Sequence, residues 1–342
     1  MATEVFPVID VSCLDDFTPK SAEITRACQD WGFFILTGYG IPQATIDRMF
    51  ALNQGFCALS PSEKSKFPID QRQIGYDLKH SKSGAHESMV FGGVKGEVQD
   101  THGLNTYWDA AKREEIETFK AQCHELSHKL LRTFAQEFGL PSTYFSEAHS
   151  DASNPPNVLR MLHYPKFETR PANDIPRIKA HTDWGSITFV FPRSGGLEVE
   201  TPSGEWLEVP LVPGGVVVNI GDALHLWSGR ALKSTLHRIS FDRLPIDQDR
   251  WSIAYFVNAN NDSRLEVLQK QADGTHAPQP GGIVLTAGEY YDARMYGSRL
   301  NDAERNWVSK ATNLDYYEGL LKKVQQVGVA DHSVVADKLV AV

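Results

Sequence analysis

Two histidines and one aspartate in this chain have residue types and a spacing that suit a single metal ion. His181 and Asp183 are separated by one residue, and His237 follows much farther along the chain. Two imidazoles and one carboxylate can occupy one face of an octahedron around Fe(II), which leaves the other positions open for oxygen and a chelating co-substrate. The pattern therefore predicts a mononuclear non-haem iron(II) centre with these three side chains as ligands.

Strands would have to bring these residues together. Side chains two residues apart point to the same side of an extended strand, so His181 and Asp183 can project together from one strand end. His237 lies in a run, residues 236–241, in which apolar and polar residues alternate after a turn at residues 228–230. A His-x-Asp tripeptide by itself more often marks a solvated turn, so the metal hypothesis needs a second signal.

The second signal is Arg250, which opens an apolar run, together with Ser252. Arginine offers a planar fork of donors that matches a carboxylate, and a serine two residues later faces the same way and adds a hydroxyl donor. Together these side chains predict a pocket for a dicarboxylate whose other end reaches the metal.

Composition and charge narrow the class of protein. The chain has 342 residues, 41% hydrophobic and 23% charged, which is enough for one elaborated globular domain or two fused lobes. Its net charge of -9 comes from interleaved acids and bases without a basic run, so we expect no nucleic acid and no membrane as partners. The cysteine pattern and the absence of a signal-peptide pattern favour a reducing, cytoplasmic location.

The first part of the chain mixes short apolar runs with helical patterns. Residues 1–108 are expected to form an α/β region, including a helix at about residues 44–60. Within it, residues 68–106 look irregular and are rich in Gly, Lys, Ser and His. A segment of that length in a compact protein is more than a connector. We expect it to line the pocket and to form a mobile cover over it.

The remaining sequence predicts a mainly β core flanked by helices. A scaffold helix is expected within residues 109–150, because apolar residues recur every three or four positions from 110 to 138. Residues 151–285 break into short β-branched and aromatic runs divided by turn signals, which favours a β-sandwich or barrel. Residues 286–342 are expected to form C-terminal helices and a tail.

A competing signal lies in the scaffold helix, where His124, Glu125 and His128 form the HExxH pattern of zinc proteases. At about 100° per residue, the apolar stripe of this helix centres near Cys123 and Leu130. The three polar side chains would then face solvent or a loop instead of a packed cleft. This geometry disfavours a zinc-protease site.

Several short motifs occur in a fixed order along most of the chain. They are FPVID (6–10), WGFF (31–34), LRMLHYP (159–165), HTD (181–183), GGLEV (195–199), NIGD (219–222), STLHR (234–238) and RWSIA (250–254). In this order they resemble the 2-oxoglutarate/Fe(II)-dependent dioxygenase superfamily, in particular its isopenicillin N synthase-like branch. At the position of Leu162 plant members often carry Asn, so this motif is more similar to that of fungal members, which include thymine hydroxylases.

The resemblance implies a double-stranded β-helix, or jelly roll, with an N-terminal α/β region and C-terminal helices. It implies Fe(II), 2-oxoglutarate and O2 as metal and co-substrates, and Tyr164 beside Arg250 and Ser252 at the 2-oxoglutarate carboxylate. The implied reaction oxidises an unactivated C–H bond of a small metabolite, and we expect a place in secondary metabolism. Hydroxylation, desaturation and cyclisation are all compatible with the same fold and metal.

Strand alternation extends the predicted pocket. If Tyr164 faces the iron, then Arg160 shares its face, and if Arg250 faces it, then so does Phe256. Trp184 directly follows the metal-binding tripeptide. A cation with two aromatic side chains would suit a flat or carboxylate-bearing substrate. The alternative is that Arg160 makes an internal salt bridge and Phe256 belongs to the core.

Tyr76 and Phe91, within the irregular segment, are expected to line the far wall of the pocket. Two other function classes stay open. An oxidase like isopenicillin N synthase would use the arginine and serine for its substrate and would need no 2-oxoglutarate. A binding module that has lost catalysis is disfavoured, because all three ligands and the arginine–serine pair are present. The oligomeric state stays open.

Overall fold

A computed structural model of the chain describes residues 5–69, 74–77, 86–92, 107–150, 157–168, 177–240, 242, 244, 247–282, 284–300, 319–320, 322–324 and 326. The strands are β1 (Val8–Asp10), β2 (Phe33–Thr37), β3 (Gly75–Asp77), β4 (Glu87–Gly92), β5 (Val158–Tyr164), β6 (Ile178–His181), β7 (Ile187–Pro192), β8 (Leu197–Glu200), β9 (Trp206–Glu208), β10 (Val216–Ile220), β11 (His237–Ile239), β12 (Arg250–Val257), β13 (Arg264–Glu266), β14 (Leu268–Lys270), β15 (His276–Pro278) and β16 (Val284–Thr286). The helices are η1 (Thr18–Lys20), α1 (Ser21–Asp30), α2 (Gln43–Cys57), α3 (Pro61–Lys64), α6 (Ala110–Glu137), α7 (Tyr144–Glu147), α8 (Asp222–Trp227) and α9 (Ala287–Leu300).

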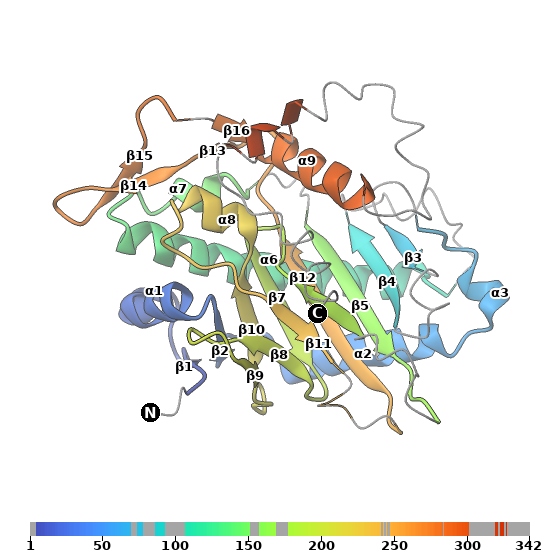
Figure 1. Cartoon of the computed structure of the whole chain (residues 1–342). Coiled ribbons are helices and arrows are strands. Elements are labelled where there is room, and N and C mark those ends of the chain that lie inside the picture. Colours follow the sequence, from blue (N-terminus) through green and yellow to red (C-terminus); the bar gives the residue numbers. More distant parts are fainter. Residues whose placement is uncertain are drawn as a thin grey trace.

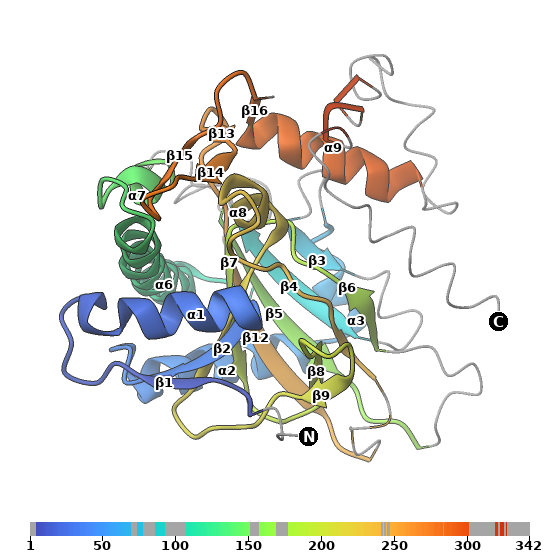
Figure 2. The same cartoon turned by 60° about the vertical axis from the view of Figure 1, so that its left-hand side comes forward.

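Two sheets build the core. Within the described residues the larger sheet has eight strands in the order β1-β2-β10-β7-β12-β5-β4-β3, and all its pairs are antiparallel except β1 with β2. The smaller sheet has the order β6-β11-β8-β9 and is antiparallel throughout. Strands of the smaller sheet lie across one face of the larger one (Figure 1; Figure 2). This is the jelly roll predicted from the sequence.

Alternation gives the larger sheet two different faces. In β12, Ile253 and Tyr255 belong to the core cluster that contains the helix side chains, whereas Ala254 belongs to a separate cluster. That separate cluster also contains Val199 and Ile239 of the smaller sheet. Because successive strand residues point to opposite sides, one face, here called the helix face, packs on the helices. The other, called the inner face, packs on the smaller sheet.

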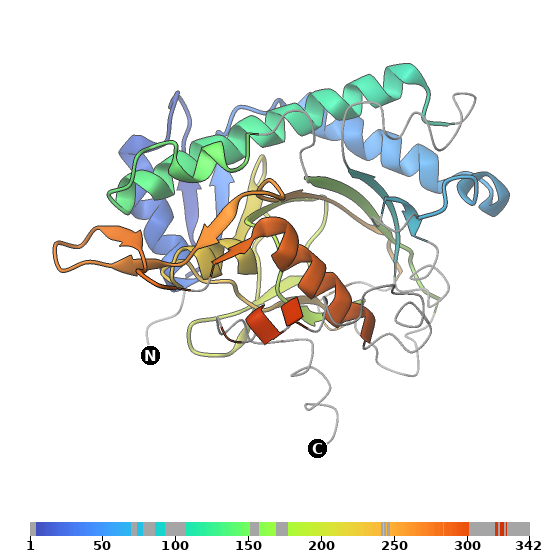
Figure 3. The same cartoon turned by 90° about the horizontal axis from the view of Figure 1, so that it is seen from above.

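The long helix α6 is the main support of the helix face. It begins after Asp109, whose side chain accepts a hydrogen bond from the backbone amide of Lys112 at 3.0 Å. Buried residues such as Phe119 and Leu130 recur along one side of it, as the apolar periodicity predicts. Figure 3 shows α2 and α6 along one side of the strands and α9 on the other side. The inner face is therefore left for the smaller sheet.

Part of the segment 68–106 is more regular than expected. Strands β3 and β4 extend the larger sheet beyond β5, and every residue of both strands is buried. Turn-rich flanks concealed these short strands in the sequence, and pairing with β5 makes them regular. The proposed mobile cover would fall on residues 70–73, 78–85 and 93–106, which lie outside the described residues.

The C-terminal part packs beside the jelly roll. Helix α9 begins directly after β16, which pairs with β13, and β14 pairs with β15. The expected helical region at 286–342 thus contains α9, although residues 301–318 and 327–342 lie outside the described residues. None of the helices in the described part of the chain has the length and apolar character required to span a membrane.

Candidate active site

Strands β6 and β11 bring the three predicted ligands together. His181 ends β6 and is paired in register with His237, which begins β11. Nε2 of His181 and Nε2 of His237 each lie 3.7 Å from Oδ1 of Asp183. Their ligating atoms all lie within 4.8 Å of one another. Residues far apart in sequence thus form one compact group of two nitrogens and one oxygen.

Backbone contacts orient both imidazoles. Nδ1 of His181 lies 2.8 Å from the carbonyl oxygen of Lys179, and Nδ1 of His237 lies 3.2 Å from that of Thr235. A carbonyl oxygen only accepts, so each Nδ1 carries the proton and each Nε2 keeps its lone pair. A backbone acceptor on the distal ring nitrogen is the usual arrangement of metal-binding histidines.

Two donors on the inner face hold the carboxylate of Asp183. Its Oδ2 accepts hydrogen bonds from Nδ2 of Asn219 at 2.8 Å and from Oγ1 of Thr188 at 2.7 Å. Burial raises the pKa of Asp183, but the two imidazoles and these hydrogen bonds outweigh burial and the pKa is lowered. The carboxylate is therefore ionised at neutral pH, with Oδ1 turned toward the imidazoles.

The surroundings of His237 also keep its imidazole neutral. Burial, followed by repulsion from His181, lowers the pKa of His237. The ring of His237 also packs edge-on against Phe33, with the ring centres 5.3 Å apart. Unprotonated nitrogens beside an ionised carboxylate are the donor set that a divalent metal requires. The residues present therefore fit Fe(II).

A second polar group lies on the inner face where β5 ends and β12 begins. Arg250 is paired in register with Tyr164, and its guanidinium carbon lies 4.7 Å from the ring centre of Tyr164. Nη1 of Arg250 donates to Oγ of Ser252 at 3.2 Å, and Nε donates to the carbonyl of Gly195 at 2.8 Å. All three predicted co-substrate residues are buried and close together.

The charge of Arg250 lacks an acidic partner in the part of the chain that the structure describes. Burial lowers the pKa of Arg250, although an arginine keeps its proton at neutral pH. A buried guanidinium without an anion is costly, because desolvation is then not offset. An anion beside the guanidinium would offset this cost.

Of the predicted substrate residues, Arg160 and Phe256 lie on the inner face, and Trp184 directly follows Asp183. Arg160 is paired with Ala254 on the inner face, and its Nη2 lies 3.8 Å from Oδ2 of Asp77. Burial lowers the pKa of Arg160, and the charges of Asp77 and Asp183 partly offset this effect. Trp184 and Phe256 are half-buried. Both alternatives predicted for Arg160 therefore apply, since it has an internal acidic partner and also lies on the face of the sheet that carries the site.

Tyr76 and Phe91 do not lie where the sequence predicted. Phe91 packs edge-on against Trp108 with ring centres 4.9 Å apart, and Tyr76 packs against Phe56 at 5.5 Å. Both side chains belong to the helix-face core cluster. The expectation that they line the pocket is wrong, because the register of β4 against β5 turns Phe91 away from the inner face, and that of β3 against β4 turns Tyr76 away.

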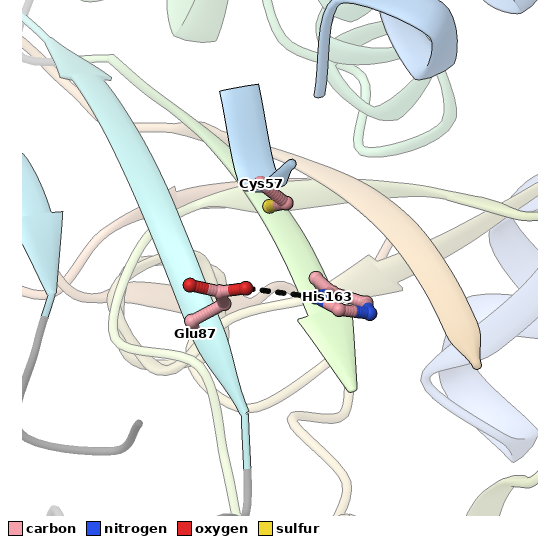
Figure 4. Close-up of side chains that lie close together, drawn as sticks. All are labelled: Cys57, Glu87 and His163. Atoms are coloured by element: carbon pink, nitrogen blue, oxygen red, sulfur yellow. Dashed lines mark hydrogen bonds and ion pairs between the residues drawn. The ribbon is translucent and has the colours of Figure 1, made fainter. Parts of the chain in front are cut away.

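A second group of ligand-type side chains lies on the helix face. Cys57, Glu87 and His163 also have ligating atoms within 4.8 Å of one another, and Figure 4 shows them converging from three elements. Glu87 accepts hydrogen bonds from Nδ1 of His163 at 2.9 Å, from Nζ of Lys64 at 2.8 Å and from the hydroxyl of Tyr76. The carboxylate already has a cation.

The protonation states of this second group differ from those of the first. Burial raises the pKa of Glu87, but the hydrogen bonds outweigh burial and lower it to about 2. Burial raises the pKa of the Cys57 thiol, which therefore stays protonated and a poor ligand. The group is best described as a buried ion-pair network.

The HExxH residues do not converge on a site. Glu125 is exposed, whereas His124 and His128 are half-buried with ring centres 4.4 Å apart. Nδ2 of Asn157 lies 3.2 Å from Nδ1 of His124, and Nε2 of His128 lies 3.4 Å from the carbonyl oxygen of His149. The glutamate cannot act as a base for a metal held between these two rings.

Several residues that shape the site were missed from the sequence. Asn219 and Thr188 hold Asp183 and are paired with each other across β10 and β7. Each is the polar residue of an otherwise apolar strand. Because a buried polar side chain needs a hydrogen-bond partner, this pattern could have predicted that both residues bind a polar group of the site. Burial lowers the pKa of the nearby Arg177 to about 10.

Comparisons with known proteins agree with this geometry. A family model described as the 2OG-Fe(II) oxygenase superfamily matches residues 156–259, and one described as the N-terminal region of non-haem dioxygenases in morphine synthesis matches residues 6–141. The UPF0676 protein C1494.01 of Schizosaccharomyces pombe is 32% identical over 84% of this chain and 92% of its own length. The 2-oxoglutarate-dependent dioxygenase tropC of Talaromyces stipitatus is 28% identical over 85% and 95%.

A solved structure is similar as well. The full-length thymine hydroxylase of Neurospora crassa in complex with alpha-KG and 5-formyluracil superposes with a TM-score of 0.72 at 27% identity, covering 85% of this chain and 96% of that chain. A further structure of the same protein contains thymine with alpha-KG.

Proposed function

Because the chain belongs to the 2OG-Fe(II) oxygenase superfamily, we propose that His181, Asp183 and His237 hold its iron for oxidation of a C–H bond in a small metabolite. The chain is a 2-oxoglutarate-dependent Fe(II) dioxygenase. Iron, 2-oxoglutarate and O2 together supply the oxidant that attacks an unactivated C–H bond. One observation supports this ligand set above all. One carboxylate oxygen and two Nε2 atoms converge, and hydrogen bonds made by the other atoms of the same side chains fix their orientation.

Arg250, Ser252 and Tyr164 are proposed to bind the distal carboxylate of 2-oxoglutarate. The guanidinium supplies the charge, and the two hydroxyls add donors. Burial raises the pKa of Tyr164, so its hydroxyl keeps its proton and can donate. The lack of a carboxylate partner for Arg250 among the described residues supports this assignment, because the co-substrate would provide the missing anion.

Arg160, Trp184 and Phe256 are proposed to contact the organic substrate. A cation on the inner face and two half-buried aromatic side chains suit a planar or carboxylate-bearing molecule. The planar pyrimidines in the structures of the Neurospora crassa enzyme support this class by analogy. Whether hydroxylation, desaturation or cyclisation follows depends on which hydrogen the substrate presents. We also propose a role in secondary metabolism. Four free cysteines favour a cytoplasmic location.

The test is oxygen consumption and succinate formation by the iron-loaded protein, with and without 2-oxoglutarate. The substrate panel combines planar heterocycles with small carboxylic acids. We expect one class to stimulate succinate formation in wild type and not in Asp183→Ala. Substrate-driven oxygen consumption without 2-oxoglutarate would instead identify an oxidase like isopenicillin N synthase. A protein that binds no iron would revive the binding-module alternative.

A further inference from the structure

A buried ion pair joins the C-terminal helix to the short helix beside the site. Nη2 of Arg294 in α9 lies 3.0 Å from Oδ2 of Asp222, the first residue of α8. Their side chains are only 10% and 5% exposed. A buried pair of this kind adds little net stability, because desolvation of both charges offsets their attraction. Its effect is to fix one relative position of the two helices.

Asp222 also holds the segment that carries two of the proposed ligands. Oγ1 of Thr182, between His181 and Asp183, donates to Oδ2 of Asp222 at 3.0 Å. The backbone amide of Asp222 donates to the carbonyl of Asp183 at 2.7 Å. Residues 181–184, here called the ligand turn, are thus attached to Asp222 by both its side chain and its backbone.

Arg294 reaches the last residue of the ligand turn as well. Its guanidinium carbon lies 5.5 Å from the ring centre of Trp184, within the range of a cation–π contact. The backbone amide of Ala223 donates to the carbonyl of Trp184 at 3.1 Å. One guanidinium therefore contacts the indole directly and the ligand turn through Asp222.

From these contacts we infer that Arg294 is a positioning residue, which holds the ligand turn and the Trp184 indole in the geometry that oxidation of the substrate requires. The inference rests on the proposed function, which gives His181, Asp183 and Trp184 their roles. Without the guanidinium, the indole loses its cation and Asp222 keeps an unpaired buried charge. The substrate would then lie less precisely, and 2-oxoglutarate would be consumed with less oxidation of the substrate.

Three variants test this inference in the full chain. Arg294→Lys keeps the charge but loses the planar fork, and Arg294→Met removes the charge while keeping an extended side chain. The double variant Arg294→Met with Asp222→Asn leaves no uncompensated charge, so it guards against simple misfolding. Arg48→Met is the control for loss of an arginine pair away from the ligand turn, at a more exposed position. It removes a bidentate arginine pair with Glu115, at 2.6 and 3.0 Å, on the other side of the sheet.

The first readout needs no turnover. The amides at positions 222 and 223 donate to the ligand turn, so their hydrogen exchange reports how firmly it is held. For Arg294→Met we expect exchange at these amides to accelerate about tenfold, the effect of losing one charged interaction. The double variant should show the same direction, Arg294→Lys should be intermediate, and Arg48→Met should match wild type.

The second readout is the ratio of succinate to oxidised product, with the substrate KM. In Arg294→Met we expect the ratio and KM to rise, while titrated iron affinity changes less. The inference would be overturned if Arg294→Met and the double variant both kept the wild-type amide exchange rates and the wild-type ratio of succinate to product. The ion pair of Arg294 and Asp222 would then serve only to attach α9. Failure of the proposed function is a separate result, because wild type itself would then form no succinate.

Discussion

Two groups of three ligand-type side chains lie on opposite sides of the larger sheet. The inner group comprises His181, Asp183 and His237, and the helix-face group comprises Cys57, Glu87 and His163. In both groups the potential ligand atoms lie within 4.8 Å of one another. Distance alone therefore does not separate a metal site from a structural network.

Hydrogen bonding separates the two groups. In the inner group the surroundings occupy both Nδ1 atoms and one carboxylate oxygen, which leaves three ligand atoms facing one another. In the helix-face group Lys64 already neutralises Glu87, and burial keeps the Cys57 thiol protonated. A metal there would have to displace a lysine and a proton. Unused lone pairs, more than proximity, distinguish the proposed metal site from the helix-face group.

Removal of one inner ligand should have the largest effect. We expect His181→Ala, Asp183→Ala and His237→Ala each to abolish turnover and iron binding, with a melting temperature near that of wild type, since packing stabilises the core. His163→Ala, from the helix-face group, should retain full iron stoichiometry. Iron titration with thermal unfolding makes the comparison. Loss of iron in His163→Ala, or retention of iron in Asp183→Ala, would contradict the distinction between the two groups.

The next effect concerns the co-substrate. Arg250→Lys keeps the charge but loses the fork, so we expect 2-oxoglutarate binding to weaken by about one to two powers of ten. Iron affinity should barely change, because this carboxylate is distal to the metal. The apparent constants for 2-oxoglutarate and for the organic substrate are to be compared in the same variant. If only the substrate constant rises, Arg250 binds the substrate's carboxylate instead.

A neighbour of the inner group should have a smaller effect. Asn219→Ala removes one of the two donors to Oδ2 of Asp183, and we expect iron affinity to fall about 10- to 100-fold, as for other partners of metal ligands. Asn53→Ala is the control. Asn53 is an equally buried asparagine in α2 that donates to the carbonyl of Leu162 at 3.2 Å. Equal loss of iron affinity in both variants would point to general destabilisation.

The sequence was sufficient where the signal is local or where motifs occur in order. Periodicity from 110 to 138 predicted α6 (Ala110–Glu137) nearly to the residue. The motif order predicted the jelly roll, and the spacing predicted that His237 would join His181 and Asp183. In each case the information lies in strand or helix alternation, which the chain carries by itself.

Features that depend on pairing between distant segments were not predictable. Phe91 does not face the pocket as predicted. Packing between β4 and β5 sets the strand register, and a shift of one residue reverses the direction of every side chain. The same holds for Lys64 beside Glu87 and for Arg294 beside Asp222, which are ion pairs between separate elements. Their residue types are common, and only the fold makes them partners.

The smallest effect on iron is expected from the helix-face group itself, where pH offers the sharpest test. The pKa of Glu87 is about 2 in the folded protein against an ordinary 4.5. A lowered folded pKa means that the unfolded chain binds more protons between these values, so stability rises with pH across this window. The shift corresponds to about 3 kcal/mol, present above pH 4.5 and lost as the pH falls toward 2.

Glu87→Gln should remove this pH dependence. It should also destabilise the protein by about 3 kcal/mol at neutral pH, because Lys64 is left buried without its anion. Urea unfolding of wild type and variant at several values between pH 3 and 7 measures both effects, and the two stabilities should converge as the pH falls. Iron affinity at pH 7 should stay at the wild-type value. A constant stability difference at every pH would mean that Glu87 is not ionised in the network, and a lower iron affinity would mean that the two groups are coupled through the sheet between them.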